Sequence, residues 1–150
     1  MKVKKILAVA SRGGHFIQLK RLEPTLSQYK ITWVTTYKKN MRSKSSRDTV
    51  YVRDASMSEK TVLILTAFQL LICVLKHKPD IVISTGAAPG YFAVVWGKLF
   101  KAKTIWLDSI ANTESMSLAG QKAKYWTDIW CTQWPHLKKN NGPYYIGSVL

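Results

Sequence analysis

The residue best suited to chemistry in this chain is His15, which follows the glycine pair Gly13-Gly14 directly after an apolar run. An imidazole titrates near neutral pH, so it can take a proton from a hydroxyl group or bind a phosphate. Asp108 has the comparable position after the apolar segment 103–107 and is the second candidate for an acid or base. Each has a structural alternative, because His15 could only hydrogen-bond its turn and Asp108 could cap the next segment.

Two glycine-containing turns offer backbone N–H groups to an anion. Gly13 and Gly14 form the first, and the second runs over Gly86, Ala87, Ala88, Pro89 and Gly90. Glycine permits a tight turn and close approach of a ligand, and helix starts favour negative charge, so we expect a phosphate or diphosphate. Neither turn has the G-x-G-x-x-G or G-x-x-x-x-G-K-[ST] pattern. The sequence therefore disfavours NAD, FAD and P-loop chemistry, and no cofactor is predicted.

The elements that must hold these turns alternate along the chain. Near-continuous Val/Ile/Leu strands separated by helices predict a parallel sheet covered on both faces, in a Rossmann-like α/β fold. A length of 150 residues corresponds to a single domain. The expected strands are 3–10, 30–36, 49–52, 80–84, 103–107, 128–132 and 144–146, and the expected helices are 14–28, 59–77, 91–100 and 120–126.

The predicted helix at 59–77 is unusually apolar. Ser56 and Glu59 fit a capping box at its start. Its polar positions Thr66, Gln69 and Cys73 form only a weak stripe, so almost the whole circumference is apolar and must face protein or lipid. A fully buried core helix would need a further cover, which a partner chain could supply. We favour membrane contact, with Leu63, Phe68 and Leu71 facing lipid and Lys76 and Lys78 among anionic headgroups.

The charge and the cysteines limit the functional classes. Lys and Arg number 23 against 8 Asp and Glu, a formal net charge of +15, which predicts an anionic partner such as nucleic acid, acidic lipid or a phosphate-bearing substrate. Some of this charge lies at 38–47, where a solvated loop is the simpler interpretation. Cys73 and Cys131 lack metal-ligand spacing, so no metal site is predicted. The apolar start is too short for a signal peptide, and we expect a cytosolic chain.

Several motifs in a fixed order make the chain similar to one family. They are Gly13-Gly14-His15, Ile83-Ser84-Thr85-Gly86, Trp106-Leu107-Asp108-Ser109, the run from Glu114 to Gly120, Gln133-Trp134-Pro135, and the segment from Tyr145 to Leu150. This set resembles the membrane-anchoring, acceptor-side subunit of split GT-B glycosyltransferases. Relatives of that kind belong to the two-chain UDP-N-acetylglucosamine transferase acting on dolichol-diphosphate sugars, or assist bacterial exopolysaccharide and capsule glycosyltransferases.

The resemblance implies the N-terminal, acceptor half of a GT-B fold over residues 1–150, and a separate donor-binding catalytic chain as partner. It implies a polyprenyl-diphosphate-linked saccharide as acceptor, with Gly13, Gly14, His15 and 86–90 at the cleft. Asp108, Ser109, Glu114, Ser115 and Ser117 would line the strand ends nearby. The expected place is the cytoplasmic face of a bacterial membrane, as a peripheral or monotopic protein inactive alone. Departures include Asp108 where Glu is usual and His136 where an acid is common.

Two other functions fit parts of the sequence. A basic Rossmann-like nucleic-acid-binding module would use the net charge, but it would leave the apolar helix unexplained and no nucleic-acid-binding motif is present. A self-sufficient small enzyme acting on a nucleotide would need a phosphate-binding fingerprint that the chain lacks. The split-transferase interpretation is preferred and predicts no nucleic-acid partner.

Overall fold

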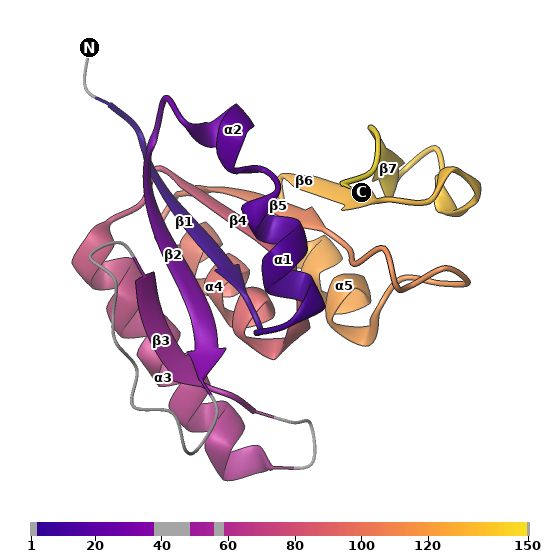
Figure 1. Cartoon of the computed structure of the whole chain (residues 1–150). Coiled ribbons are helices and arrows are strands. Elements are labelled where there is room, and N and C mark those ends of the chain that lie inside the picture. Colours follow the sequence, from indigo (N-terminus) through magenta and orange to yellow (C-terminus); the bar gives the residue numbers. More distant parts are fainter. Residues whose placement is uncertain (1–2, 38–48, 56–58, 150) are drawn as a thin grey trace.

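The computed structural model describes residues 3–37, 49–55 and 59–149. The basic segment at 38–47 and the expected capping residue Ser56 lie outside these ranges. Within them the chain forms a seven-stranded, wholly parallel sheet in the order β3-β2-β1-β4-β5-β6-β7 (Figure 1). The strands are β1 Lys5–Ala10, β2 Lys30–Tyr37, β3 Thr49–Arg53, β4 Ile81–Gly86, β5 Lys103–Leu107, β6 Ile129–Thr132 and β7 Tyr144–Tyr145.

The helices lie on both faces of the sheet. Helix α1 crosses in front of it in Figure 1, whereas α3, α4 and α5 lie behind. The bounds are α1 Gly14–Lys20, α2 Glu23–Leu26, α3 Lys60–His77, α4 Ala87–Leu99 and α5 Leu118–Ala123, with short 3-10 turns at η1 Lys124–Trp126 and η2 Pro135–Leu137. The alternating pattern of strands and helices predicted from the sequence is confirmed.

Three helix predictions were wrong in detail, each for a local reason. The single helix expected at 14–28 is two helices, because Pro24 lacks an N–H and fits only the first turn of the new helix α2. Pro89 lies likewise in the first turn of α4, which begins at Ala87 instead of 91. The N-cap of α3 is Glu59, whose side chain makes no capping hydrogen bond, so the predicted capping box is not the start signal.

The strands contribute side chains to two hydrophobic cores, one on each face of the sheet. Alternate residues of the central strands, including Leu7, Val9 and Val82, pack against α3, α4 and α5 around the fully buried Trp106. The intervening residues, including Ile6, Ala8 and Ile83, pack against α1. This period of two is what a strand covered on both faces requires. The strand order reverses between β1 and β4, and the crevice at the carboxyl ends of such a pair is where open α/β sheets bind ligands.

Helix α3 is inverted in polarity. Thr66 and Cys73 are buried against the sheet with Leu70 and Val74, and Thr66 Oγ1 donates to the carbonyls of Val62 (2.9 Å) and Arg53 (3.2 Å). The outward face instead carries an exposed apolar stripe, which we call the α3 stripe: Ile64, Leu65, Phe68, Ile72 and Leu75. The polar residues Thr66 and Cys73 are therefore buried in the core, and the exposed surface of the helix is apolar.

Candidate functional site

The two glycine turns meet at the carboxyl ends of β1 and β4. Gly13 has a φ of 82° and precedes α1, which places His15 in the first helical turn. Thr85 Oγ1 donates to the backbone carbonyl of His15 at 2.6 Å, and His15 Nδ1 lies 3.1 Å from the carbonyl of Thr85. These reciprocal bonds join residues 70 positions apart in sequence and fix the first turn against the second.

The bond to Thr85 determines the tautomer of His15. A carbonyl oxygen can only accept, so Nδ1 must carry the hydrogen, and in the neutral ring Nε2 is left with a free lone pair. The ring is half-buried and packs on Gly86, where an added Cβ would lie 2.5 Å from Nδ1. His15 is therefore oriented by its backbone partner and retains a basic nitrogen, which is the arrangement of a general base.

The second turn divides into a packed part and an accessible part. Pro89 and Gly90 are buried, and a Cβ on Gly90 would collide with Ser84 Oγ, which itself accepts from the backbone N of Gly86 at 3.1 Å. Gly86 has a φ of 140°, and Ala87 has a positive φ of 63°. Ala87 and Ala88 are half-exposed at the start of the 13-residue helix α4. A ligand could thus reach the turn only at its alanines.

An apolar hollow of about 470 Å³ opens beside those alanines. It lies between the first turns of α3, α4 and α5, and its lining includes Leu63, Ala88, Tyr91, Phe92 and Leu118, with Lys122 as a cation. The hollow adjoins the second glycine turn on one side and the start of α3 on the other. A molecule with a phosphate at one end and a hydrocarbon chain at the other would match this sequence of surfaces.

Asp108 lies in the same strand-end region but has a different environment from His15. It is 1% exposed, and its carboxylate accepts four hydrogen bonds. Oδ1 accepts from Trp106 Nε1 (2.9 Å) and Ser117 Oγ (2.6 Å), and Oδ2 accepts from Asn112 Nδ2 (3.0 Å) and the backbone N of Ser117 (2.8 Å). A carboxylate so fully engaged fixes the loop between β5 and α5, so the geometry favours a structural role for Asp108, which holds the N-cap residue Ser117.

Ser109 belongs to a buried amide network that the sequence analysis did not identify. Its Oγ accepts from Gln18 Nε2 at 3.2 Å, and Gln18 Oε1 in turn accepts from Gln133 Nε2 at 2.7 Å. Gln133 Oε1 accepts from the backbone N of Val149 at 2.8 Å. The network joins α1, the β5 loop, the end of β6 and the segment after β7. A lone glutamine next to Leu19 on the inward face of an amphipathic helix was the available signal.

Glu114 is not brought to the glycine turns. It is exposed, and with Ser115 it lines a separate hollow that Lys124, Trp130 and Pro143 also line. Ser117 caps α5, where its Oγ accepts from the backbone N of Gly120 at 2.9 Å. Of the predicted residues, His15, Gly13, Gly14 and the 86–90 turn therefore converge, whereas Glu114 points to a different hollow.

Arg12 is a cation in the first turn that the sequence analysis did not single out. Its backbone N donates to Thr36 Oγ1 at 3.1 Å, and its Nε lies 3.0 Å from Asp54 Oδ2. Both partners of that ion pair are over 40% exposed, so the pair contributes little stability. It does connect the first turn to the ends of β2 and β3, and its position in a glycine turn was the signal.

The predicted membrane residues occupy two environments. Phe68 lies in the α3 stripe, Lys76 and Lys78 are exposed, and Leu63 and Leu71 are only half-exposed. The sequence analysis did not identify the other stripe members or Leu99 and Phe100 at the end of α4, which are also exposed. By length and composition α3 could cross a membrane, with a mean hydropathy of 1.5, though such a helix alone is weak evidence. Leu70 and Val74 belong to the core, so one side of α3 is held by the sheet.

Comparison with known proteins gives a family and a fold. Residues 25–149 match the family model described as "Oligosaccharide biosynthesis protein Alg14 like". A search of curated protein sequences found no match. Among solved structures, MurG from Acinetobacter baumannii has a TM-score of 0.75 at 11% identity, covering 98% of this chain and 46% of that one.

Two epimerases show the same likeness. UDP-N-acetylglucosamine 2-epimerase from Rickettsia bellii has a TM-score of 0.70 at 13% identity, over 90% of this chain and 40% of that one. A putative enzyme of the same kind from Listeria monocytogenes has 0.68 at 12%, over 89% and 40%. The chain spans less than half the length of these structures. At such low identities the similarity shows the fold alone. It confirms the predicted Rossmann-like sheet, which matches the N-terminal half of a GT-B glycosyltransferase.

Proposed function

We propose, from the premise that this chain belongs to the Alg14-like family of oligosaccharide biosynthesis proteins, that it is the acceptor-side subunit of a two-chain glycosyltransferase. It binds a polyprenyl-diphosphate-linked saccharide at the cytoplasmic face of a bacterial membrane and recruits the donor-binding catalytic chain, in polysaccharide biosynthesis. The observation that carries the proposal is the junction of His15 with the second glycine turn beside an apolar hollow.

The chemistry proposed for His15 follows from its tautomer. Nε2 takes the proton of the acceptor hydroxyl as that oxygen attacks the anomeric carbon of the donor sugar, and the nucleoside diphosphate leaves with the bonding electrons. The acceptor diphosphate lies against Ala87 and Ala88, and its hydrocarbon chain enters the apolar hollow lined by Leu63 and Phe92. General base catalysis of this kind contributes about 10²–10⁴-fold.

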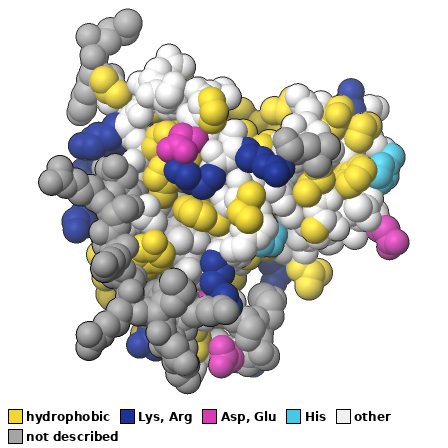
Figure 2. All heavy atoms as spheres, in the orientation of Figure 1, with side chains coloured by type: hydrophobic (Ala, Val, Ile, Leu, Met, Phe, Trp, Pro, Cys, Tyr) yellow, Lys and Arg dark blue, Asp and Glu magenta, His cyan; other side chains and the backbone are white. Residues whose placement is uncertain are grey.

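A second chain is proposed because transfer needs two substrates in one cleft. Correct positioning supplies up to about 7–11 kcal/mol of the barrier reduction. The crevice at the carboxyl ends of β1 and β4 belongs to a single sheet, so it offers only one wall of such a cleft. Exposed apolar residues at the β6–β7 side of the sheet suit a protein partner: Ile129, Tyr144 and Ile146. Figure 2 shows hydrophobic side chains gathered over β6, β7 and the segment between them.

Membrane association is proposed from the α3 stripe. The core side of α3 is packed on the sheet, so the helix lies on the membrane surface and does not cross it. Its outward apolar residues enter the headgroup boundary, as in other interfacial helices. Lysines at its end, Lys76 and Lys78, then lie near anionic lipid.

The test is reconstitution. Co-expression with a donor-half chain should give a complex that transfers sugar from a UDP-sugar to a polyprenyl-diphosphate acceptor, and this chain alone should give none. The variant His15→Gln should lower kcat in the complex, and Gln28→Glu, on the exposed loop between α2 and β2, serves as a charge-changing control. Robust transfer by the isolated chain would overturn the two-chain proposal, and unchanged turnover in His15→Gln would overturn the role of His15.

A further inference from the structure

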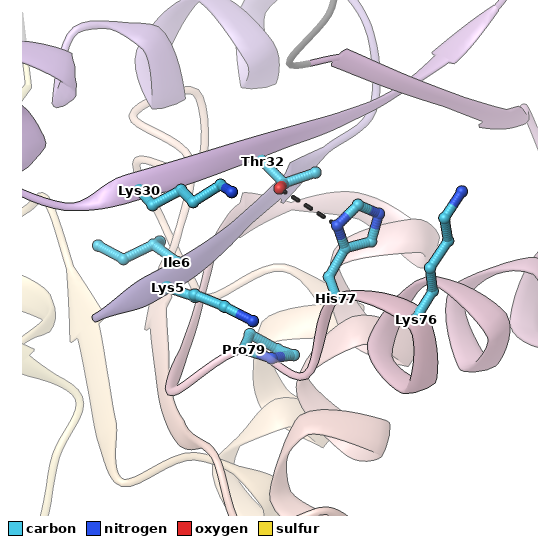
Figure 3. Close-up of a pocket in the computed structure, with 7 residues that line it drawn as sticks. All are labelled: Lys5, Ile6, Lys30, Thr32, Lys76, His77 and Pro79. Atoms are coloured by element: carbon cyan, nitrogen blue, oxygen red, sulfur yellow. Dashed lines mark hydrogen bonds between the residues drawn. The ribbon is translucent and has the colours of Figure 1, made fainter. Parts of the chain in front are cut away.

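A basic notch lies at the amino ends of β1 and β2, at the end of the sheet opposite the glycine turns. It has a volume of about 210 Å³ and forms where α3 ends against the first residues of β1 and β2 (Figure 3). Lys5 of β1, Lys30 and Thr32 of β2, and Lys76 and His77 of α3 line it. Four of these five side chains are cationic or can become so, and they come from three separate elements.

The residues that line this notch include lysines but no acid. No carboxylate is among the residues that line it, and Lys5, Lys30 and Lys76 form no ion pair within the part of the chain that the structure describes. Asp80 is the acid nearest in sequence, and its Oδ2 accepts from the backbone N of Lys5 at 2.7 Å. Three ammonium groups that line one concave site, with no carboxylate in the same lining, create a field that attracts an anion.

The pKa of His77, which lines the notch, responds to the charges of the three lysines. Burial lowers the pKa of His77, and the charges of Lys76, Lys5 and Lys30 lower it further. Its Nδ1 lies 3.4 Å from Thr32 Oγ1 (Figure 3). The ring and the hydroxyl offer hydrogen-bonding groups beside the ammonium charges, which is the combination that phosphate oxygens use.

The notch includes the end of α3, one residue beyond the α3 stripe. Leu75 is the last apolar residue of the stripe, and Lys76 follows it directly. An interfacial helix buries its apolar face about 5–10 Å into the boundary between headgroups and acyl chains. If the stripe lies at that depth, the end of α3 brings the notch to the level of the lipid phosphates.

We propose that the notch of Lys5, Lys30, Thr32, Lys76 and His77 binds the phosphate of an anionic phospholipid headgroup. This site is distinct from the acceptor turns, and it rests on the membrane association within the proposed function. A bound phosphate holds the basic C-terminal end of α3 against the membrane surface. The apolar hollow and the glycine turns at the other end of the helix are thereby held at a fixed orientation to the membrane.

The first test compares two double variants that remove equal charge. Lys5→Gln with Lys30→Gln removes two lysines of the notch, whereas Lys101→Gln with Lys103→Gln removes two exposed lysines outside it at the same end of the molecule. Binding is measured by co-sedimentation with phosphatidylcholine vesicles with and without phosphatidylglycerol. A lysine near an anionic membrane contributes about fivefold in affinity, so the notch pair should lose about 25-fold and the control pair less than fivefold. Equal losses would mean general charge attraction only and would overturn the site.

The second test uses His77 as a probe by NMR pH titration, with His77→Gln to assign its signal. Adding short-chain phosphatidylglycerol should raise the pKa of His77, because a bound phosphate offsets the lysine charges that lower it. No rise would overturn the site, and an equal rise with inorganic phosphate would assign the notch to a soluble anion instead. The tests separate the two proposals. Equal losses in the two double variants, with sugar transfer intact, would refute only the notch. Absence of both vesicle binding and sugar transfer in the unaltered protein would refute the proposed function.

Discussion

Replacing three outward residues of the α3 stripe tests membrane association most directly. The variant Ile64→Ser, Phe68→Ser and Ile72→Ser removes side chains that are 69%, 57% and 48% exposed. Full burial of such a side chain is worth about 1.5–3 kcal/mol, and weighting by the exposed fractions gives about 3–5 kcal/mol for the three. At about 1.4 kcal/mol per tenfold change, vesicle binding should fall by roughly 100-fold to 5,000-fold.

The fold should survive this variant, because the three side chains lie outside the core and serine has a helix propensity close to those of isoleucine and phenylalanine. Circular dichroism and thermal unfolding check that expectation. A matched control is Ile17→Ser, Tyr125→Ser and Ile146→Ser, whose original side chains are all more than half exposed and belong to α1, η1 and the segment after β7. The assay is flotation with phosphatidylglycerol-containing vesicles. Equal losses in both triple variants, or no loss in the α3 variant, would refute the argument that α3 faces lipid.

Four further variants test the site and the ion pair between Lys98 and Asp128. His15→Ala should lower kcat of the reconstituted complex about 100-fold with little change in Tm, whereas Gly86→Ala should lower both, because the new Cβ would lie 2.5 Å from the imidazole and φ is 140°. Asp108→Asn should cost about 3 kcal/mol in urea unfolding, since an amide NH₂ cannot accept from the donors around it; a loss under 1 kcal/mol with abolished transfer would instead indicate catalysis. Burial raises the pKa of Asp128, but hydrogen bonds from Lys98 and Thr104 outweigh it and hold the pKa below its ordinary value of 3.8. The stability from this carboxylate is present above that value and is lost as the pH falls through the lowered pKa, so Asp128→Asn should flatten the acid limb of a Tm-against-pH curve.

The sequence predicted the sheet well because its strands are buried on both faces. Ile6 and Leu7 enter opposite cores, so the apolar run of β1 has no polar interruption that could be mistaken for a loop. The meeting of the glycine turns was also predictable, since parallel strands place their carboxyl ends at one edge. Pairing of β1 with β4 then brings His15 to Thr85 and Gly86.

Roles that depend on long-range partners could not be predicted. The function of Asp108 is decided by Ser117 and Asn112, whose distance from it depends on how the loop folds. The inward orientation of Thr66 depends on where β3 ends, because the carbonyl of Arg53 is one of its acceptors. Polarity alone would have turned Thr66 towards solvent, and hence the outward residues Ile64 and Ile72 were not identified.

The inverted polarity of α3 also governs how the protein behaves in a test tube. Copies in dilute, low-salt buffer carry a formal charge of +15 and repel one another, which keeps their α3 stripes apart. Salt near 1 M shortens the Debye length to about 3 Å and removes that repulsion, while the attraction between apolar faces remains. Colloidal stability should therefore fall as salt is added, so that the high-salt wash used to strip nucleic acid from basic proteins would promote self-association unless a mild detergent covers α3.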